Sequence, residues 1–319
     1  MTLILEATVE NIRKAADRLK SGGLAAFPTE TVYGLGADAT NDRAMAALFA
    51  AKGRPVFNPV IVHFTDRGEA GKAVVFNDRA EILAKAFWPE PLTLILPRRE
   101  DADISLLCSA GLPTLAVRCP SHPVAQELIK ALGCPIAAPS ANKSGSLSPT
   151  TPQHVLQSLG ENAGLILAGG RAAVGLESTV ADMTGDAPVL LRPGAVTLED
   201  LRRHVGDVMV ETEAAGDRPK SPGRLLKHYA PKTPLRLKAV DAKQGEALLA
   251  FGLVGGATLN LSERGDLNEA AANLFSMLHH LDAGGFKTIA VMDIPEAGLG
   301  MAINDRLRRA AAGVLPREA

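Results

Sequence analysis

Short apolar segments alternate with amphipathic helical segments along most of this chain of 319 residues. In the first two thirds, apolar runs bounded by turn residues predict strands at 24–27, 60–64, 92–96, 114–119, 135–138, 165–168, 179–183 and 189–192. Segments with apolar residues at helical spacing predict helices at 9–20, 42–52, 123–132, 152–159 and 198–204. This order is typical of an α/β or α+β fold built on a sheet of mixed strand directions.

The periodicity stops between residues 211 and 234. This stretch holds four prolines and two glycines, a composition typical of a linker or mobile loop. A second alternation follows it, with strands predicted at 235–237, 257–261 and 288–294 and helices at 245–250, 268–282 and 302–312. We therefore predict a larger domain over 1–210, a linker over 211–234 and a smaller Rossmann-like α/β domain over 235–319.

Composition and charge exclude several classes of protein. The net charge is −1 and aromatic residues make up 4% of the chain, so no overall field attracts nucleic acid and few rings are present for base stacking. The three cysteines form no CxxC motif, which fits a reducing compartment. No signal peptide and no apolar run of membrane-spanning length occur in the sequence, so we expect a cytoplasmic protein without membrane contact.

Two loops carry more polar side chains than a turn requires. Residues 28–36 mix hydroxyl groups with glycines directly after a predicted strand, and glycine lets backbone N–H groups approach a ligand. Residues 139–145 end another strand with Ser140, Asn142 and Lys143, each of which can donate a hydrogen bond. For each loop taken alone, the alternative interpretation is an ordinary β-turn that carries polar side chains.

Cationic side chains occur at the ends of other predicted elements. Arg118 and Arg192 interrupt or end apolar strands, where a charge is costly to bury unless it meets an anion. An exposed edge position is the alternative for Arg118. Lys52 and Arg54 end a helix, where a cation also interacts favourably with the helix dipole. Together with the two polar loops, these residues predict a site for several anions at strand ends.

The sequence lacks the motifs that are typical of several other kinds of site. No GxxxxGK[ST] motif, no GxGxxG after a strand, no HExxH and no GxSxG motif occur in the chain. Cys108 and Cys134 lie beside or within apolar runs and are predicted to be core thiols, not nucleophiles. We therefore expect no metal bound directly by side chains and no P-loop.

Six motifs in order resemble the YrdC-like domain of threonylcarbamoyl-AMP synthases. They lie at 27–39 (FPTETVYGLGADA), 52–63 (a Lys-Gly-Arg-Pro series), 115–120 (LAVRCP), 139–145 (PSANKSG, followed by a Ser-Pro-Thr), 177–180 (ESTV) and 190–194 (LLRPG). Residues 221–235, 260–266 and 298–311 resemble the long form of this family, which has a linker and a C-terminal domain. The resemblance implies a twisted sheet of mixed parallel and antiparallel strands with flanking helices for 1–210, followed by the smaller domain.

The resemblance also implies an activity. Such an enzyme, a nucleotidyltransferase, converts L-threonine, bicarbonate and ATP into threonylcarbamoyl-AMP and diphosphate, with Mg²⁺ bridging the phosphate oxygens of ATP. A partner tRNA threonylcarbamoyl transferase complex then modifies the adenosine next to the anticodon of ANN-decoding tRNAs. Direct binding of tRNA to this chain is left open, and the linker is expected to close over the site as a lid.

The resemblance assigns site residues by position. The threonine-binding residues are Thr31, His63, Arg118, Ala138 and Ser178. The ATP-binding residues are Arg54, Asn58, Thr114, Ser140, Ser148, Arg192 and Tyr229. The catalytic hallmark of the family comprises Lys52, Arg54, Ser140 and Asn142.

Two other functions are weighed against this one. A non-catalytic RNA-binding module is disfavoured by the net charge and the few aromatic residues. A carbamoyl-transfer enzyme of hydrogenase maturation contains a related domain, but such chains also carry acylphosphatase-like and zinc-finger segments. This sequence has no zinc-type cysteine cluster.

Overall fold

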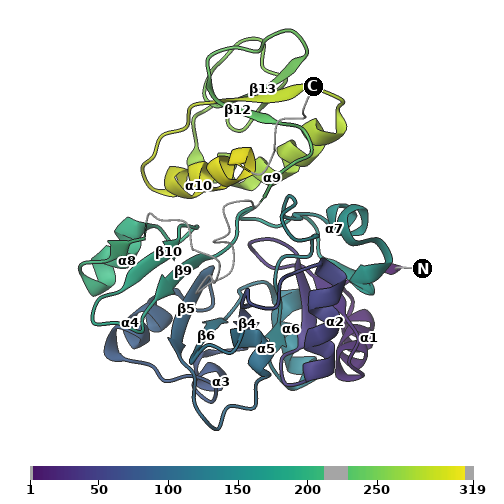
Figure 1. The fold of residues 1–319 in the computed structure, drawn as a ribbon, viewed down its shortest axis with the longest axis vertical. Coiled ribbons are helices and arrows are strands. Elements are labelled where there is room, and N and C mark those ends of the chain that lie inside the picture. Colours follow the sequence, from purple (N-terminus) through teal and green to yellow (C-terminus); the bar gives the residue numbers. More distant parts are fainter. Residues whose placement is uncertain (1–2, 212–228, 313–319) are drawn as a thin grey trace.

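The computed structural model describes residues 3–211 and 229–312, which form two sheets with their helices (Figure 1). The larger sheet has 11 strands and the smaller has four. The predicted fold class, a large mixed sheet with flanking helices plus a smaller α/β unit, is confirmed. The last strand of the large sheet ends at Val210, and the first strand of the small sheet begins at Leu235. The predicted domain limits stay a proposal. Residues 212–228, which make up most of the linker that is expected to close over the site, lie outside the described residues.

The large sheet mixes parallel and antiparallel neighbours. Its strand order is β1-β8-β2-β3-β7-β4-β6-β5-β9-β10-β11. The strands are β1 (Leu3–Glu6), β2 (Ala25–Phe27), β3 (Gly34–Asp38), β4 (Val62–His63), β5 (Leu92–Pro97), β6 (Thr114–Arg118), β7 (Ile136–Ala137), β8 (Leu165–Ala168), β9 (Thr179–Asp182), β10 (Val189–Arg192) and β11 (Met209–Val210).

Helices bury both faces of the large sheet. Alternate residues of β2 enter two separate core clusters, because successive side chains of a strand point to opposite faces. One cluster holds α1 (Val9–Lys20) and α6 (Pro123–Leu132). The other cluster holds residues of α2 (Asp42–Lys52), the short α3 (Arg67–Ala70), α4 (Asp78–Phe87), α5 (Leu106–Ser109), α7 (Pro152–Leu159) and α8 (Leu198–Val205).

The smaller sheet is entirely parallel, in the order β12-β15-β13-β14. Its elements are β12 (Leu235–Ala239), β13 (Glu246–Ala250), β14 (Leu259–Asn260), α9 (Leu267–Ala283), β15 (Thr288–Met292) and α10 (Leu299–Ala312). The helix predicted at 245–250 is therefore wrong, because these residues form β13. Residues 247–250 are all buried, and a fully buried run shows no period that separates strand from helix.

The two sheets are joined by a shared core. Both α9 and α10 lie on the face of the small sheet that is turned toward the large one (Figure 1). Their apolar side chains form one cluster with Val32, Leu147, Leu176 and Tyr229. Gly175 allows this close approach, because a Cβ added there would lie 2.6 Å from the carbonyl oxygen of Ala271. The second domain therefore packs directly behind the loops that carry the predicted site.

Candidate active site

A pocket with an empty volume of about 530 Å³ lies where several strands of the large sheet end. The predicted site residues among its lining are Thr31, Arg54, His63, Arg118, Ala138, Ser140, Ser178, Arg192 and Tyr229. The other lining residues are Thr29, Val32, Gly34, Ile61, Pro139 and Glu177. Segments from residue 29 to residue 229 thus meet at one site.

Strand register explains part of this convergence. His63 is paired with Arg118 across β4 and β6, and Arg118 is paired with Thr93 across β6 and β5. Thr93 is in turn paired with Val180 of β9, which places Ser178 at the same edge of the sheet. The imidazole, the guanidinium group and the hydroxyl therefore come together because β4 and β6 end, and β5 and β9 begin, at the same level.

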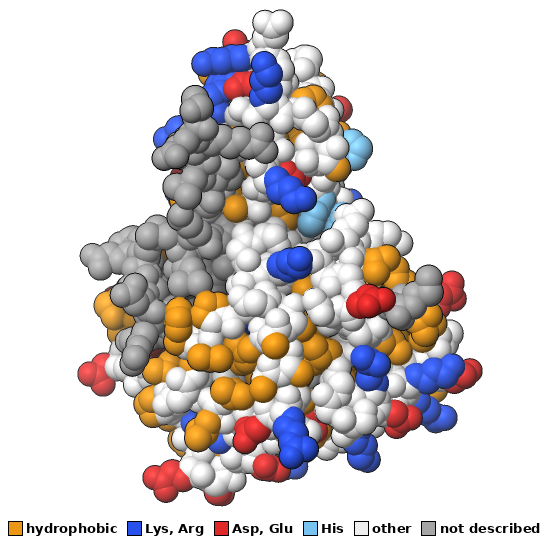
Figure 2. Space-filling view, turned by 45° about the vertical axis from the view of Figure 1, so that its right-hand side comes forward, with side chains coloured by type: hydrophobic (Ala, Val, Ile, Leu, Met, Phe, Trp, Pro, Cys, Tyr) orange, Lys and Arg blue, Asp and Glu red, His pale blue; other side chains and the backbone are white. Residues whose placement is uncertain are grey.

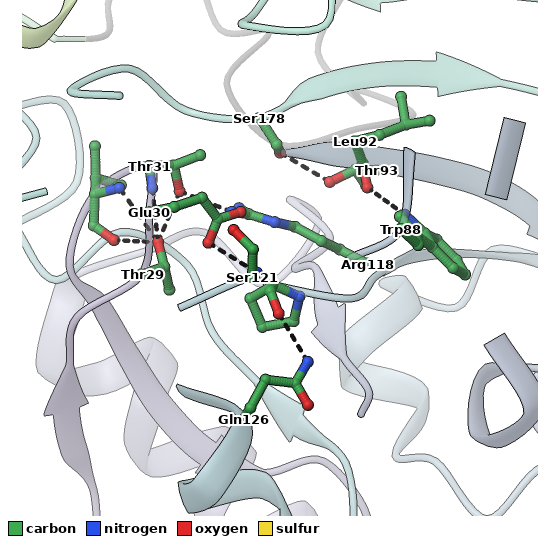
Figure 3. A network of polar contacts seen from close by, with 12 residues as sticks. Thr29, Glu30, Thr31, Trp88, Leu92, Thr93, Arg118, Ser121, Gln126 and Ser178 are labelled. Atoms are coloured by element: carbon green, nitrogen blue, oxygen red, sulfur yellow. Dashed lines mark hydrogen bonds and ion pairs between the residues drawn. The ribbon is translucent and has the colours of Figure 1, made fainter. Parts of the chain in front are cut away.

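Arg118 keeps its charge inside the protein by pairing with Glu30 (Figure 3). The same terminal nitrogen of Arg118 donates to the hydroxyl of Thr31 at 3.0 Å, and the Glu30 carboxylate also accepts the backbone N–H of Ser121 at 3.2 Å. The Arg118 Nε atom is buried and has no hydrogen-bond partner in the part of the chain that the structure describes. Glu30 was not predicted as a site residue, although it lies inside the motif at 27–39.

Ser178 and Arg192 are held together as one unit. Arg192 donates to the backbone carbonyl of Ser178 at 3.0 Å and to its hydroxyl at 3.1 Å, and Thr93 shares a 2.8 Å hydrogen bond with that hydroxyl. A Cβ on Gly194 would lie 2.7 Å from the carbonyl carbon of Ser178. Only glycine therefore lets the turn after Arg192 close against this strand.

Arg54 is fixed by the loop that follows it. Its guanidinium group donates to the Asn58 side chain at 2.7 Å, to the Asn58 carbonyl at 3.0 Å and to the Pro59 carbonyl at 2.7 Å. Burial lowers the pKa of Arg54 to about 10, with Tyr229 raising the pKa and Arg192 lowering it further. The group stays cationic at neutral pH and is oriented toward the pocket without a carboxylate partner among the described residues.

Lys52 and Asn142 lie behind the pocket wall and build the loop that presents Ser140. The Lys52 ammonium donates to the carbonyls of Ser140 and Asn142. The Asn142 side-chain amide donates to the carbonyl of Ser146 at 2.8 Å and to that of Lys143 at 2.9 Å. Burial and then the charge of Arg54 lower the pKa of Lys52 well below its usual value. The direct role predicted for these two residues near the phosphates stays a prediction.

Three predicted ATP-binding residues also lie outside the pocket lining. Asn58 orients Arg54, and Ser148 donates its hydroxyl hydrogen to the Glu177 carboxylate. Thr114 begins β6, four residues before Arg118, which corresponds to about 13 Å along an extended strand. Its assignment to ATP stays a prediction.

Several buried polar atoms of the predicted site have no hydrogen-bond partner. Counting partners within residues 3–211 and 229–312 only, they are Asn58 Nδ2, His63 Nδ1, Arg118 Nε and Asn142 Oδ1. An unsatisfied buried polar group costs about 1–3 kcal/mol, so such groups in a native structure require an explanation. A bound polar ligand would supply the missing partners for those that face the pocket.

His63 is a neutral imidazole in this site. Burial, followed by the nearby charge of Arg118, lowers its pKa to about 3. The same factor acts on the buried Cys108, whose pKa is raised to about 12 by burial. His63 can therefore accept or donate a hydrogen bond at neutral pH, and Cys108 is a core thiol as predicted.

Clusters for direct metal ligation are not found in residues 3–211 and 229–312, where no three His, Cys, Asp or Glu side chains gather. Glu30 and Glu177 of the pocket region are each paired with an arginine. In the same described ranges, no helix has the length and apolar character needed to cross a membrane.

The fold and the pocket define a class of protein: a two-domain α/β protein with an arginine-lined pocket at the edge of its large sheet. Residues 17–194 match the family model described as Telomere recombination (Sua5, YciO and YrdC), and residues 196–312 match the model for the C-terminal domain of threonylcarbamoyl-AMP synthase.

Relatives of known name match nearly the whole chain. A threonylcarbamoyl-AMP synthase of Pyrococcus abyssi is 40% identical over 320 residues, covering 94% of both chains. One of Bacillus subtilis is 39% identical over 326 residues, covering 95% of this chain and 93% of the relative. The crystal structure of P. abyssi Sua5 complexed with L-threonine has a TM-score of 0.91 at 36% identity and covers 98% of each chain. The chain belongs to the threonylcarbamoyl-AMP synthase family, as its motifs predicted.

The hydrogenase-maturation alternative receives no such support. A full-length HypF structure is 23% identical with a TM-score of 0.51 and is covered over 28% of its length. At this identity the likeness shows a shared domain fold only.

Proposed function

We propose that this chain joins L-threonine, bicarbonate and ATP into threonylcarbamoyl-AMP with release of diphosphate, as a nucleotidyltransferase. The observation that carries the proposal is the convergence of three guanidinium groups, those of Arg54, Arg118 and Arg192, on one pocket. The three substrates bring a carboxylate, a bicarbonate and a triphosphate, whose mutual repulsion must be offset before they react. Buried cations of fixed geometry offset it most effectively.

The threonine carboxylate would bind Arg118. The guanidinium group is planar and can hold a carboxylate through two parallel hydrogen bonds, and the Glu30 pair already fixes its orientation. The P. abyssi relative has been crystallised with L-threonine, which supports a threonine site in this fold. His63 and Ser178 would contact the remainder of the amino acid as neutral hydrogen-bonding groups.

The triphosphate would lie between Arg54, Arg192 and the loop that carries Ser140. Mg²⁺ would arrive with ATP, neutralising the phosphate oxygens while keeping most of its water ligands. Because Glu30 and Glu177 are each paired with an arginine, we assign the ion no side-chain ligand. The Tyr229 ring would pack beside the nucleotide.

The chemistry needs little covalent assistance from the protein. The neutral amine of threonine attacks the carbon of bicarbonate, and loss of water leaves a carbamate. A carbamate oxygen then attacks the α-phosphorus of ATP, and diphosphate departs in line with the new bond. Positioning of the reactants can supply about 7–11 kcal/mol of the barrier. His63, with a pKa of about 3, is a weak base, so we assign it to substrate orientation and not to proton removal.

Several broader assignments remain part of the proposal. The product would pass to a tRNA threonylcarbamoyl transferase complex in the cytoplasm. Direct tRNA binding is a separate question: Lys and Arg side chains are interspersed with Asp and Glu on the face shown in Figure 2, which argues against an extended basic surface there. Steeply salt-dependent RNA binding without ATP turnover would favour the RNA-binding alternative.

One assay tests the proposal. The protein is incubated with ATP, Mg²⁺, ¹⁴C-bicarbonate and each amino acid, and a labelled adenylate is expected only with threonine. Arg54→Ala removes a phosphate-facing cation and should reduce diphosphate release at least tenfold, since a hydrogen bond to a charged group contributes about 1.5–3 kcal/mol. Arg43→Ala, an exposed change on α2, is the matched control. Normal turnover of the folded Arg54→Ala variant would refute the phosphate role.

A further inference from the structure

One side chain of the second domain lies directly behind the pocket. Arg306 of α10 has a fully buried side chain, although it is the longest and most polar kind of side chain in the protein. Its guanidinium group forms an ion pair with Glu177 at 2.8 Å and another with Asp305 at 2.8 Å. It also donates to the backbone carbonyl of Pro193 at 2.9 Å and is centred 5.3 Å from the ring of Tyr229.

Each contact of Arg306 outside its own helix adjoins a residue of the pocket. Glu177 precedes Ser178 in the chain, and Pro193 follows Arg192. Glu177 and Tyr229 themselves line the pocket. The guanidinium group thus connects the segment before β9 to the turn after β10, which are the two segments that Arg192 and Ser178 also join.

The Glu177 carboxylate extends this connection further into the site. One of its oxygens accepts a hydrogen bond from Arg306 Nε and the other accepts the hydroxyl of Ser148, a predicted ATP-binding residue. The backbone carbonyl of Ser148 in turn lies 3.1 Å from His279 Nε2 on α9. Two helices of the second domain therefore hold the segment around Ser148 from behind.

The charges of this cluster have a direct consequence for phosphate binding. Glu177 is an anion in the wall of a pocket that we propose holds a triphosphate. Arg306 neutralises it from the side away from the pocket, within a medium where charges interact strongly. Without Arg306, the Glu177 carboxylate would repel the phosphates and compete with them for Arg192.

We infer that Arg306 is a positioning residue for the ATP side of the pocket, so that the second domain completes the active site through this side chain. Arg306 does not touch the substrates. It fixes Glu177, the Pro193 turn and the Tyr229 ring, and it cancels an anion in the pocket wall. This inference rests on the proposed function and assigns the C-terminal domain a role in the reaction itself.

The test compares Michaelis constants in the full-length protein. Arg306→Met keeps an unbranched, flexible side chain, shorter than that of arginine, and removes the charge and all donors. We expect the KM for ATP to rise at least tenfold while the KM for threonine changes less than threefold, because the Arg118–Glu30 pair has no contact with Arg306. Arg308→Met is the matched control, because Arg308 is exposed on the same helix and pairs with the exposed Glu296.

A second substitution separates charge from packing. Adding Glu177→Gln to Arg306→Met removes the uncompensated anion, so we expect the double variant to recover a substantial part of the lost ATP affinity. Arg306→Lys keeps a charge but cannot reach the several acceptors of a guanidinium group, so an intermediate KM for ATP is expected. If Arg306→Met fails to fold, Arg306→Lys provides the test instead. The inference then requires that the KM for ATP rises more than the KM for threonine.

Equal changes in both Michaelis constants, an unchanged KM for ATP in folded variants, or no recovery in the double variant would each overturn the inference. These outcomes are distinguishable from failure of the proposed function. An unmodified protein that releases no diphosphate in response to threonine and bicarbonate would refute the function, whereas an active protein with unselective Arg306 variants would refute only the role of Arg306.

Discussion

Individual residues of the pocket keep their charge or neutrality because of specific partners. Arg118 is buried at 3% exposure, and it stays there because Glu30 reaches it from a different loop. His63 is in the opposite situation, since it is buried beside a cation and is therefore held neutral. The site combines fixed positive charge with neutral hydrogen-bonding groups, which suits anionic substrates that also carry a reactive amine.

The low pKa of His63 has a consequence for stability in acid. Its folded-state pKa of about 3 lies below the usual 6.5, so the unfolded chain binds the proton first as the pH falls. Its contribution to the free energy of unfolding is complete above about pH 6.5 and is lost as the pH falls toward 3. The slope from this one group is at most about 1.4 kcal/mol per pH unit. Denaturant unfolding of His63→Gln between pH 7 and pH 4 should show a shallower loss of stability.

The same substitution at the exposed His204 provides the control for the loss of an imidazole. Some slope should remain in His63→Gln, because burial also lowers the pKa of His154 to about 4. An identical slope in the His63 variant and the unmodified protein would show that this imidazole is not held neutral by the fold.

At the scale of elements, the pocket depends on how closely strands and turns approach one another. Gly194 has very little space beside the pocket, since a Cβ added there would lie 2.4 Å from the backbone nitrogen of Thr179. Arg192 and Ser178 are bonded across this contact. Any side chain at residue 194 must push the two segments apart and so move both groups.

Gly194→Ala should therefore destabilise the fold by about 1–3 kcal/mol, as overpacking typically does, and reduce synthase activity more than tenfold. Gly185→Ala is the matched control, because the nearest atom to its added Cβ is 3.8 Å away. Thermal unfolding and diphosphate release measured on both variants check the prediction. Equal thermal stability and equal diphosphate release of the two variants would mean that the turn at residue 194 can accommodate a Cβ without moving Arg192 and Ser178.

The sequence predicted elements well where local signals are strong. The bounds of α1, α2, α6 and α7 agree with the prediction, and each of these helices begins at a side chain that caps it. Strand β3 was not predicted, because two of its residues are glycines and glycine disfavours strands. Its place is set by tertiary packing instead, since a Cβ on Gly36 would lie 2.9 Å from the ring of Phe27.

The residues of the candidate site were likewise predicted where the local sequence signal is strong and missed where only tertiary packing brings partners together. Arginines within apolar strands and polar loops at strand ends indicated the cationic part of the pocket. Glu30, Glu177 and Arg306 were missed, because their partners lie 88 and 129 residues away in the chain. Such pairings become visible only when the strands and the second domain are placed in space.

At the scale of the whole molecule, the two domains act as one folded unit. Tyr229 is fully buried between them, in the cluster that contains α9 and α10. The stacked rings of His154 and His279, with centroids 3.9 Å apart, lie across the same boundary. Because the pocket wall and the domain interface share residues, moving the second domain should disturb the site.

Gly175→Val tests this coupling. The added side chain would enter α9 at the Ala271 carbonyl and should separate the domains, reducing ATP-dependent activity at least tenfold. Gly170→Val is the control, because Gly170 also has a positive φ of 80° but has no atom within 4 Å of an added Cβ. Hydrogen exchange should rise in α9 and near Glu177 only in the first variant. Full activity of Gly175→Val with a displaced second domain would contradict the coupling.

The most direct test of the pocket is a crystal structure with L-threonine and a non-hydrolysable ATP analogue bound together. We predict that the threonine carboxylate binds Arg118 and that the phosphates lie between Arg54, Arg192 and the Ser140 loop. The reacting groups of the two ligands should then be in van der Waals contact. Threonine or the nucleotide bound elsewhere, with the arginine-lined pocket empty, would contradict the proposed assembly of the three substrates.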